Sequence, residues 1–255
     1  MKSTELSITN KQGLKLAAIL DAPDDGHVRA YAVYAHCFTC SKDLKAIANI
    51  NGSLTKYGIA TLRFDMTAIG DSEGEFTETN FTTQVEDFLS AAAYLEQNYK
   101  APQLLIGHSL GGCVVIESAL KLPTVNAIVT IATPSEPSNL AIKLKNTKAR
   151  TLKDGIGETD IGGLKFTFKP QFWSDLENHS IRKDLYELNR PLLILHSPVD
   201  TYTSIENAGI LFENAKQPKS FISLDDMDHL MLKKSDAYYV GDLIGTWFGK
   251  YMKSE

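Results

Sequence analysis

Apolar residues follow two different spacings along this chain, and the two alternate. Short apolar runs predict β-strands, whereas apolar residues three and four positions apart predict helices. The expected strands cover residues 5–8, 14–20, 29–35, 59–64, 103–106, 126–132, 191–196 and 220–224, and the first two form a hairpin. The expected helices cover residues 43–56, 85–99, 204–214, 237–251 and a segment from residue 110. This alternation predicts an α/β protein with a mostly parallel central sheet, helices on both faces and ligands at the C-terminal strand ends.

Residues 135–190 interrupt this alternation. They contain a basic helical stretch at 140–153, a glycine-rich segment and a small hairpin at 161–168 that turns at Gly162-Gly163. We therefore expect a core made of residues 1–134 and 191–255, with 135–190 inserted as a small lid or cap.

The most informative stretch is Gly107-His108-Ser109-Leu110-Gly111, which follows one apolar strand and begins a helix. Such a Gly-x-Ser-x-Gly segment predicts a sharp, strained strand-to-helix turn that exposes the serine hydroxyl above the sheet. The N-terminus of the helix points its positive dipole end at the same place. The alternative is a glycine-rich turn around a solvated serine, so the case for a nucleophile depends on partner residues.

A serine nucleophile needs a base and an acid that orients the base. Asp200 follows the strand at 191–196, and His229 follows the next strand, at 220–224. Both therefore belong to the strand-end rim that carries Ser109. The order Ser, Asp, His is that of α/β-hydrolases and differs from the orders of chymotrypsin and subtilisin.

Each partner has a simpler interpretation. Asp200 could cap the helix that follows it, and His229 could be a solvated loop histidine. Asp225, Asp226 and Asp228 flank His229 and could bind it in place of Asp200. His27 falls in a turn, His179 in the insertion and His196 in a strand, so none of them is as well placed to be the base.

An oxyanion hole needs two N–H donors near the developing charge. We expect these to be the backbone amides of Leu110, directly after the nucleophile, and of Phe38, in the loop after the strand at 29–35. The candidate substrate pocket consists of residues near that loop and aromatic residues of the insertion: His36, Phe166, Phe168, Phe172 and Trp173. The alternatives are strand-end packing for His36 and Phe38, and a core internal to the insertion for the aromatic residues.

Two further groups of polar residues have mainly structural interpretations. Asp65 and the loop to Gly74 are expected to support the active-site rim through turn hydrogen bonds. The insertion carries a set of basic residues, namely Lys143, Lys145, Lys148, Arg150 and Lys153. They could attract an anionic part of a substrate, but a solvated helix face is the favoured interpretation.

Composition restricts the class of protein. The 255 residues are 43% hydrophobic and 22% charged, enough for one large domain. A net charge of −5 does not favour nucleic acid or an anionic membrane as a partner. The N-terminus lacks an apolar signal segment and no run is long enough to span a bilayer, so we expect a cytoplasmic protein without a membrane partner. No metal or organic cofactor is implied, and the sequence does not indicate an oligomeric state.

The chain has three cysteines, Cys37, Cys40 and Cys113, which do not form the pattern of a secreted disulfide framework. Cys37 and Cys40 make a Cys-x-x-Cys pair in the expected oxyanion loop. No thioredoxin-like pattern surrounds the pair, and no second pair completes a zinc site. We expect packing residues near the site, whose oxidation would disturb the oxyanion loop.

Five segments together resemble the α/β-hydrolase superfamily, and more closely the serine hydrolase module that occurs fused to OsmC-like domains. They are residues 35–42, 63–74, 106–112, 195–200 and 223–230. The resemblance implies esterase-like activity with Ser109, Asp200 and His229 as the triad. Cys37 departs from the His-Gly pair usual in the wider superfamily, which leaves the detailed geometry of the oxyanion loop open.

The sequence therefore predicts a serine hydrolase that cleaves small carboxylic esters or thioesters through an acyl-enzyme on Ser109. An acyltransferase with the same triad is one alternative. A non-catalytic or redox-sensing protein that uses Cys37 and Cys40 on the same scaffold is the other. The physiological substrate, the length of the acyl chain and the choice between ester and thioester are not evident from the sequence.

Overall fold

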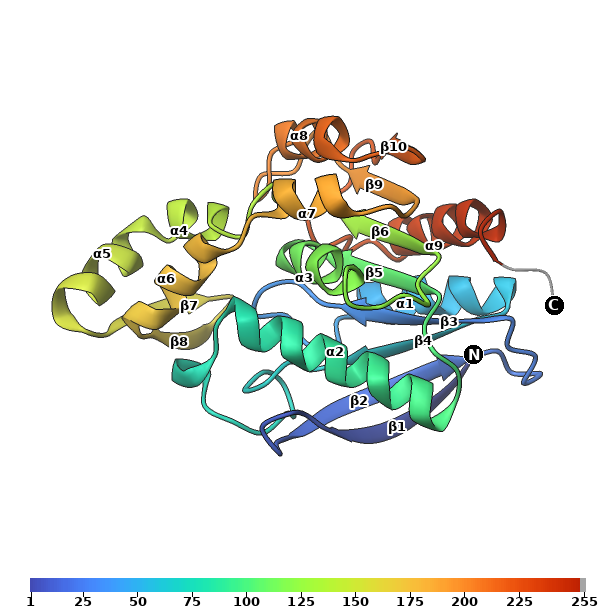
Figure 1. Cartoon of the computed structure of the whole chain (residues 1–255), viewed down its shortest axis with the longest axis horizontal. Helices are drawn as coiled ribbons and strands as arrows, with labels where there is room; N and C mark the ends of the chain where they lie inside the picture. Colours follow the sequence, from blue (N-terminus) through green and yellow to red (C-terminus); the bar gives the residue numbers. More distant parts are fainter. Residues whose placement is uncertain (253–255) are drawn as a thin grey trace.

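The computed structural model describes residues 1–252, in which eight strands form one sheet in the order β1-β2-β4-β3-β5-β6-β9-β10 (Figure 1). The strands are β1 (Lys2–Thr9), β2 (Lys15–Ala22), β3 (Ala30–Ala35), β4 (Ile59–Phe64), β5 (Leu104–His108), β6 (Ala127–Ile131), β9 (Leu192–His196) and β10 (Lys219–Ser223). The β1–β2 and β2–β4 pairs are antiparallel, and the pairs from β4 to β10 are parallel. The predicted mostly parallel sheet of the α/β-hydrolase fold is confirmed.

Helices cover both faces of this sheet (Figure 1). One face carries α1 (Lys45–Leu54) and α9 (Lys234–Gly249), and the other carries α2 (Phe81–Asn98), α3 (Leu110–Ala119), α7 (Ile181–Glu187) and α8 (Glu206–Asn214). Short 3-10 turns, η1 (Thr55–Tyr57) and η2 (Phe76–Glu78), complete the core. The parallel strands β4, β5, β6 and β9 are buried throughout, because each face of the sheet packs against its own apolar cluster, whereas the edge strand β10 is partly exposed.

The inserted segment projects from the C-terminal edge of the sheet (Figure 1). It contains α4 (Asn139–Lys143), α5 (Lys145–Asp154), β7 (Gly157–Ile161), β8 (Leu164–Phe168) and α6 (Pro170–Asn178). The predicted hairpin turns at Gly162 and Gly163, whose φ angles of 62° and 84° suit glycine. The predicted single helix at 140–153 is instead two helices broken at Leu144, and α6 and α7 had no counterpart in the prediction.

Among residues 1–252, no helix combines the length and the apolar character that crossing a membrane requires.

Candidate active site

Ser109 lies at the junction of β5 and α3, with a backbone φ of 54° and ψ of −125°. This strained conformation is the elbow that the sequence predicted. It depends on close backbone contacts: a Cβ on Gly107 would lie 2.3 Å from the Gly111 carbonyl oxygen, and a Cβ on Gly111 would lie 2.5 Å from the Ala35 carbonyl oxygen. Glycine at 107 and 111 therefore lets β5, β3 and α3 meet closely, while the Ser109 side chain remains partly exposed.

Asp200 and His229 are joined directly, in the loops after the neighbouring parallel strands β9 and β10. His229 Nδ1 and Asp200 Oδ2 lie 2.7 Å apart. The other carboxylate oxygen accepts the backbone N–H groups of Tyr202 and Thr203, at 2.7 and 2.9 Å. Asp200 is therefore neither a helix cap nor solvated, and the His229 side chain pairs with it in preference to Asp225, Asp226 or Asp228.

The environment keeps Asp200 ionised. Burial acts to raise the pKa of Asp200, but the hydrogen bond from His229 and the N–H groups of Thr203 and Tyr202 outweigh it, so its pKa lies below the usual value. An ionised Asp200 requires the proton of His229 to be on Nδ1. His229 Nε2 is then the basic nitrogen of this ring.

A second histidine supports the loop that carries His229. His108 Nε2 donates to the His229 carbonyl oxygen at 2.7 Å. Burial and the nearby His229 lower the pKa of His108 to about 3, so His108 is neutral at pH 7. His108 was not among the residues predicted from the sequence, although its place inside the Gly-x-Ser-x-Gly segment is a signal.

The site lacks one contact that a complete triad requires. Within residues 1–252, no hydrogen bond joins the Ser109 hydroxyl to His229, although the loops of both residues lie on the same edge of the sheet. Such catalytic hydrogen bonds are often loose before substrate binds. The assignment of Ser109, Asp200 and His229 as a triad stays a prediction.

The loop after β3 is fixed by hydrogen bonds and by a disulfide. His36 accepts the Met66 N–H at Nε2, at 3.2 Å, and donates from Nδ1 to the Cys37 carbonyl oxygen, at 2.8 Å. Cys37 and Cys40 are disulfide-bonded, which differs from the unpaired packing residues expected from the sequence. A separation of three residues allows this local bridge without any wider disulfide framework. The Phe38 N–H lies inside the bridged turn and donates to no group of residues 1–252.

Leu110, the other expected oxyanion donor, is the first residue of α3, so its N–H has no acceptor within the helix. Within residues 1–252, neither expected donor therefore has a hydrogen-bond acceptor. Their role in an oxyanion hole stays a prediction.

The aromatic residues expected to line a substrate pocket are buried by their neighbours. Phe166 is 7% exposed, and Phe168, Phe172 and Trp173 are at most 1% exposed. They pack on one another and on Phe38 and Phe76 of the core, for example with ring centres 4.9 Å apart for Phe76 and Phe166. His36 is also buried. The aromatic side chains therefore join the insertion to the core. The alternative of a core internal to the insertion is correct in that these residues are packed, but their cluster also includes Phe38 and Phe76 of the core.

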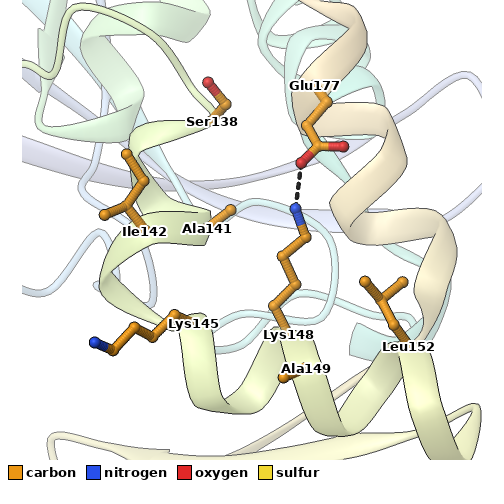
Figure 2. Close-up of a pocket in the computed structure, with 8 residues that line it drawn as sticks. All are labelled: Ser138, Ala141, Ile142, Lys145, Lys148, Ala149, Leu152 and Glu177. Atoms are coloured by element: carbon orange, nitrogen blue, oxygen red, sulfur yellow. Dashed lines mark hydrogen bonds and ion pairs between the residues drawn. The ribbon is translucent and has the colours of Figure 1, made fainter.

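An open groove lies within the insertion, between α4, α5 and α6 (Figure 2). Its volume is about 560 Å³, and Lys148 and Glu177 form an ion pair across it. Its lining residues are Ser138, Ala141, Ile142, Lys145, Lys148, Ala149, Leu152 and Glu177. Lys145 and Lys148 belong to the basic set named from the sequence, and none of the eight belongs to the predicted triad, oxyanion hole or substrate pocket. The groove is thus separate from the residues expected to carry the chemistry.

Asp65 supports the rim as expected, because its carboxylate accepts the backbone N–H groups of Lys42 and Asp71. Asp43, Asp65 and Asp71 are also close enough to resemble a metal site. However, Lys42 Nζ lies between them, at 2.8, 3.0 and 2.6 Å from their respective oxygens. The ammonium group therefore lies where a metal ion would lie and offsets part of the negative charge of the cluster.

Comparisons with known proteins agree with this architecture. The model of the hydrolase family described as "Serine aminopeptidase, S33" matches residues 27–168. The esterase domain of a Rhodothermus marinus protein is 40% identical, with a TM-score of 0.80 over 99% of this chain and 100% of that domain. Est1E from Butyrivibrio proteoclasticus, solved with ferulic acid bound, is 20% identical with a TM-score of 0.80, over 96% of this chain and 98% of its own, which shows the fold alone.

Human palmitoyl-protein thioesterase ABHD10, a mitochondrial protein by its name, is 25% identical over 205 residues. The match covers 73% of this chain and 64% of the human protein, so the chain spans less than two thirds of that relative.

Proposed function

The chain belongs to the α/β-hydrolase family described as serine aminopeptidase S33, and we propose that it cleaves small carboxylic esters or thioesters through an acyl-enzyme on Ser109. The observation that carries the proposal is the 2.7 Å hydrogen bond between His229 and Asp200, on the same edge of the sheet as the Ser109 elbow. That pair supplies an oriented, basic imidazole nitrogen, which a serine hydroxyl needs in order to attack a carbonyl.

In the proposed reaction, His229 Nε2 takes the proton of Ser109 as its oxygen attacks the carbonyl carbon. The N–H groups of Phe38 and Leu110 donate to the oxyanion of the tetrahedral intermediate. His229 then protonates the leaving alcohol or thiol, and the acyl group remains on Ser109. Water repeats the sequence with His229 as base, which releases the carboxylic acid and restores the hydroxyl. Asp200 stays ionised and stabilises the imidazolium.

The relatives support esters and thioesters as the substrate class. The Rhodothermus relative is named as an esterase domain, and the human relative as a palmitoyl-protein thioesterase. A sulfur leaving group requires no change in the proposed triad, so both classes belong in the first substrate panel. The cytoplasmic location stays a prediction, because the name of the human relative places that protein in mitochondria.

The test is labelling of the folded protein with a fluorophosphonate, followed by peptide mapping. We expect one adduct on Ser109, no adduct in Ser109→Ala, and slow labelling in His229→Ala. Hydrolysis of aryl acetates and acetyl thioesters should fall with the labelling in the same variants. The proposal is contradicted if folded Ser109→Ala hydrolyses these substrates as fast as wild type, or if wild type takes up no label on Ser109.

The disulfide between Cys37 and Cys40 favours a second candidate, a protein whose activity responds to thiols. Reduction by a dithiol would form two thiols and free the turn that holds Phe38. The comparison is between hydrolysis before and after dithiothreitol, with Cys37→Ser/Cys40→Ser as the reduced mimic. A change in wild type that is absent from the double variant supports this candidate, and equal rates under both conditions exclude it.

A further inference from the structure

Among the predicted basic set of the insertion, Lys143 contacts an aromatic ring that itself lies beside the candidate site. Its Nζ lies 5.3 Å from the centre of the Tyr202 ring. The same ring lies 5.2 Å from the imidazole of His229, with 31° between the two planes. A continuous row of side chains therefore leads from α4 of the insertion, through Tyr202, to the proposed general base.

The ammonium group of Lys143 also lacks a carboxylate partner. Within residues 1–252 it forms no ion pair and no hydrogen bond, whereas Lys148 is paired with Glu177. Partial burial lowers the pKa of Lys143, and the negative charge of Asp200 acts in the opposite direction. A cation held against a ring, without an anion of its own, remains available to an anionic ligand.

The role of His229 indicates which part of a substrate would lie near Tyr202 and Lys143. In the proposed reaction His229 donates its proton to the leaving oxygen or sulfur, so the leaving group lies next to the imidazole. Tyr202 lies against that imidazole, and Lys143 lies over the Tyr202 ring. They are therefore placed to contact the alcohol or thiol part of a substrate.

We propose that Lys143, with Tyr202 beside it, binds a carboxylate or phosphate group on the leaving-group side of the substrate, so that the preferred substrates are anionic esters or thioesters. This inference rests on the proposed function. The net charge of −5 does not by itself favour anionic ligands, so such a preference depends on a local cation.

The experiment compares two esters of similar shape, 3-acetoxybenzoate and its neutral methyl ester. We expect wild type to prefer the anionic ester, and Lys143→Gln to lower the ratio of kcat/KM for the charged over the neutral ester by about tenfold or more. The loss should appear mainly as a higher KM for 3-acetoxybenzoate. Lys143→Arg should retain the preference, and about 0.5 M NaCl should weaken it in wild type by screening the charge.

Lys153→Gln is the matched control, because Lys153 is an exposed lysine of the same insertion, at the end of α5. It should leave both kcat/KM values unchanged. Equal losses on both esters in Lys143→Gln would mean that Lys143 only holds the structure, and an unchanged ratio would mean that it contacts no anion; either result overturns the inference. If the proposed function itself is wrong, the result differs from both of these: wild type hydrolyses the neutral ester no faster than Ser109→Ala does.

Discussion

Glycine residues permit the elbow at Ser109, and their surroundings give a sharp test of that packing. A Cβ on Gly107 would meet backbone atoms of Gly111 and Gly112 at 2.3 to 2.6 Å. Because these atoms belong to the start of α3, they can move only if the helix shifts away from β5. Residue 107 thus fixes the distance between the strand and the helix at the candidate nucleophile.

We predict that Gly107→Ala destabilises the protein by at least about 3 kcal/mol, in the range of severe core overpacking, or prevents folding. Gly209→Ala is the matched control: it lies inside α8, a Cβ there meets nothing within 4 Å, and alanine favours helix. It should stabilise by about 0.5 to 1 kcal/mol. Urea unfolding of both variants measures the change in the free energy of unfolding. A small decrease in Gly107→Ala would contradict the prediction and show that α3 can move away from β5 at little cost.

Individual residues were predictable where local sequence determines their position. Ser109, Asp200 and His229 follow recognisable strands, and the carboxyl ends of parallel strands meet at one edge, so their common rim could be predicted. Lys143 was named only as one of a basic set, and its contact with Tyr202 could not be predicted, because that contact joins helix α4 to the distant loop after β9 and leaves no periodic signal. The pairing of Cys37 with Cys40 was also open, since spacing alone permits a bridge, a metal ligand pair or two thiols.

At the scale of elements, the inserted segment contacts the core through a buried aromatic cluster, through hydrogen bonds such as that from Thr82 to Asp175, and through His179. His179 follows α6, and its Nδ1 lies 2.7 Å from Glu117 Oε2 on α3. The hydrogen bond to Glu117 raises the pKa of His179 above its ordinary value, although burial opposes it. Protonated His179 is therefore favoured in the folded protein.

This contact should make docking of the insertion depend on pH. Because the folded pKa is raised, the stabilisation is fully present below the ordinary pKa of about 6.5 and is lost as pH rises through the raised value. We predict that His179→Gln destabilises more at pH 6 than at pH 9. Urea unfolding at both pH values measures the difference. His27→Gln, in an exposed turn, should show no such dependence, and an equal loss for His179→Gln at both pH values would contradict the role of the charge.

The elements of the insertion were harder to predict than those of the core. The turn of the hairpin predicted at 161–168 follows from Gly162-Gly163, which can adopt its positive φ angles, but the first strand, β7, lies N-terminal to the predicted range and begins at Gly157. Helix α6 of the insertion and helix α7, which follows it, are both short. Contacts with the core, as much as helical spacing, determine where their apolar residues lie, such as Phe172 and Leu185. Tertiary packing, rather than local pattern, thus defines most of this segment.

At the scale of the whole molecule, the question is whether core and insertion behave as one unit. A single apolar cluster runs from β4 and α2 of the core through Phe38 to Phe168, Phe172 and Trp173 of the insertion. Trp173 is fully buried in it. A lid that opened freely would have to expose this cluster, at a cost that grows with the apolar area transferred to water.

The two tryptophans of the chain report on the two parts separately, Trp173 in the insertion and Trp247 in α9, where its Nε1 donates to Ser220. Because the cluster is continuous, we predict that in Trp247→Phe the fluorescence of Trp173 changes at the same urea concentration as the far-UV circular dichroism. Trp247 fluorescence in Trp173→Phe should likewise coincide with the dichroism of that variant. If instead the Trp173 signal is lost at lower urea while the dichroism stays largely native, the insertion unfolds first. It would then have the independence that a lid requires, and access to Ser109 would be governed by its opening.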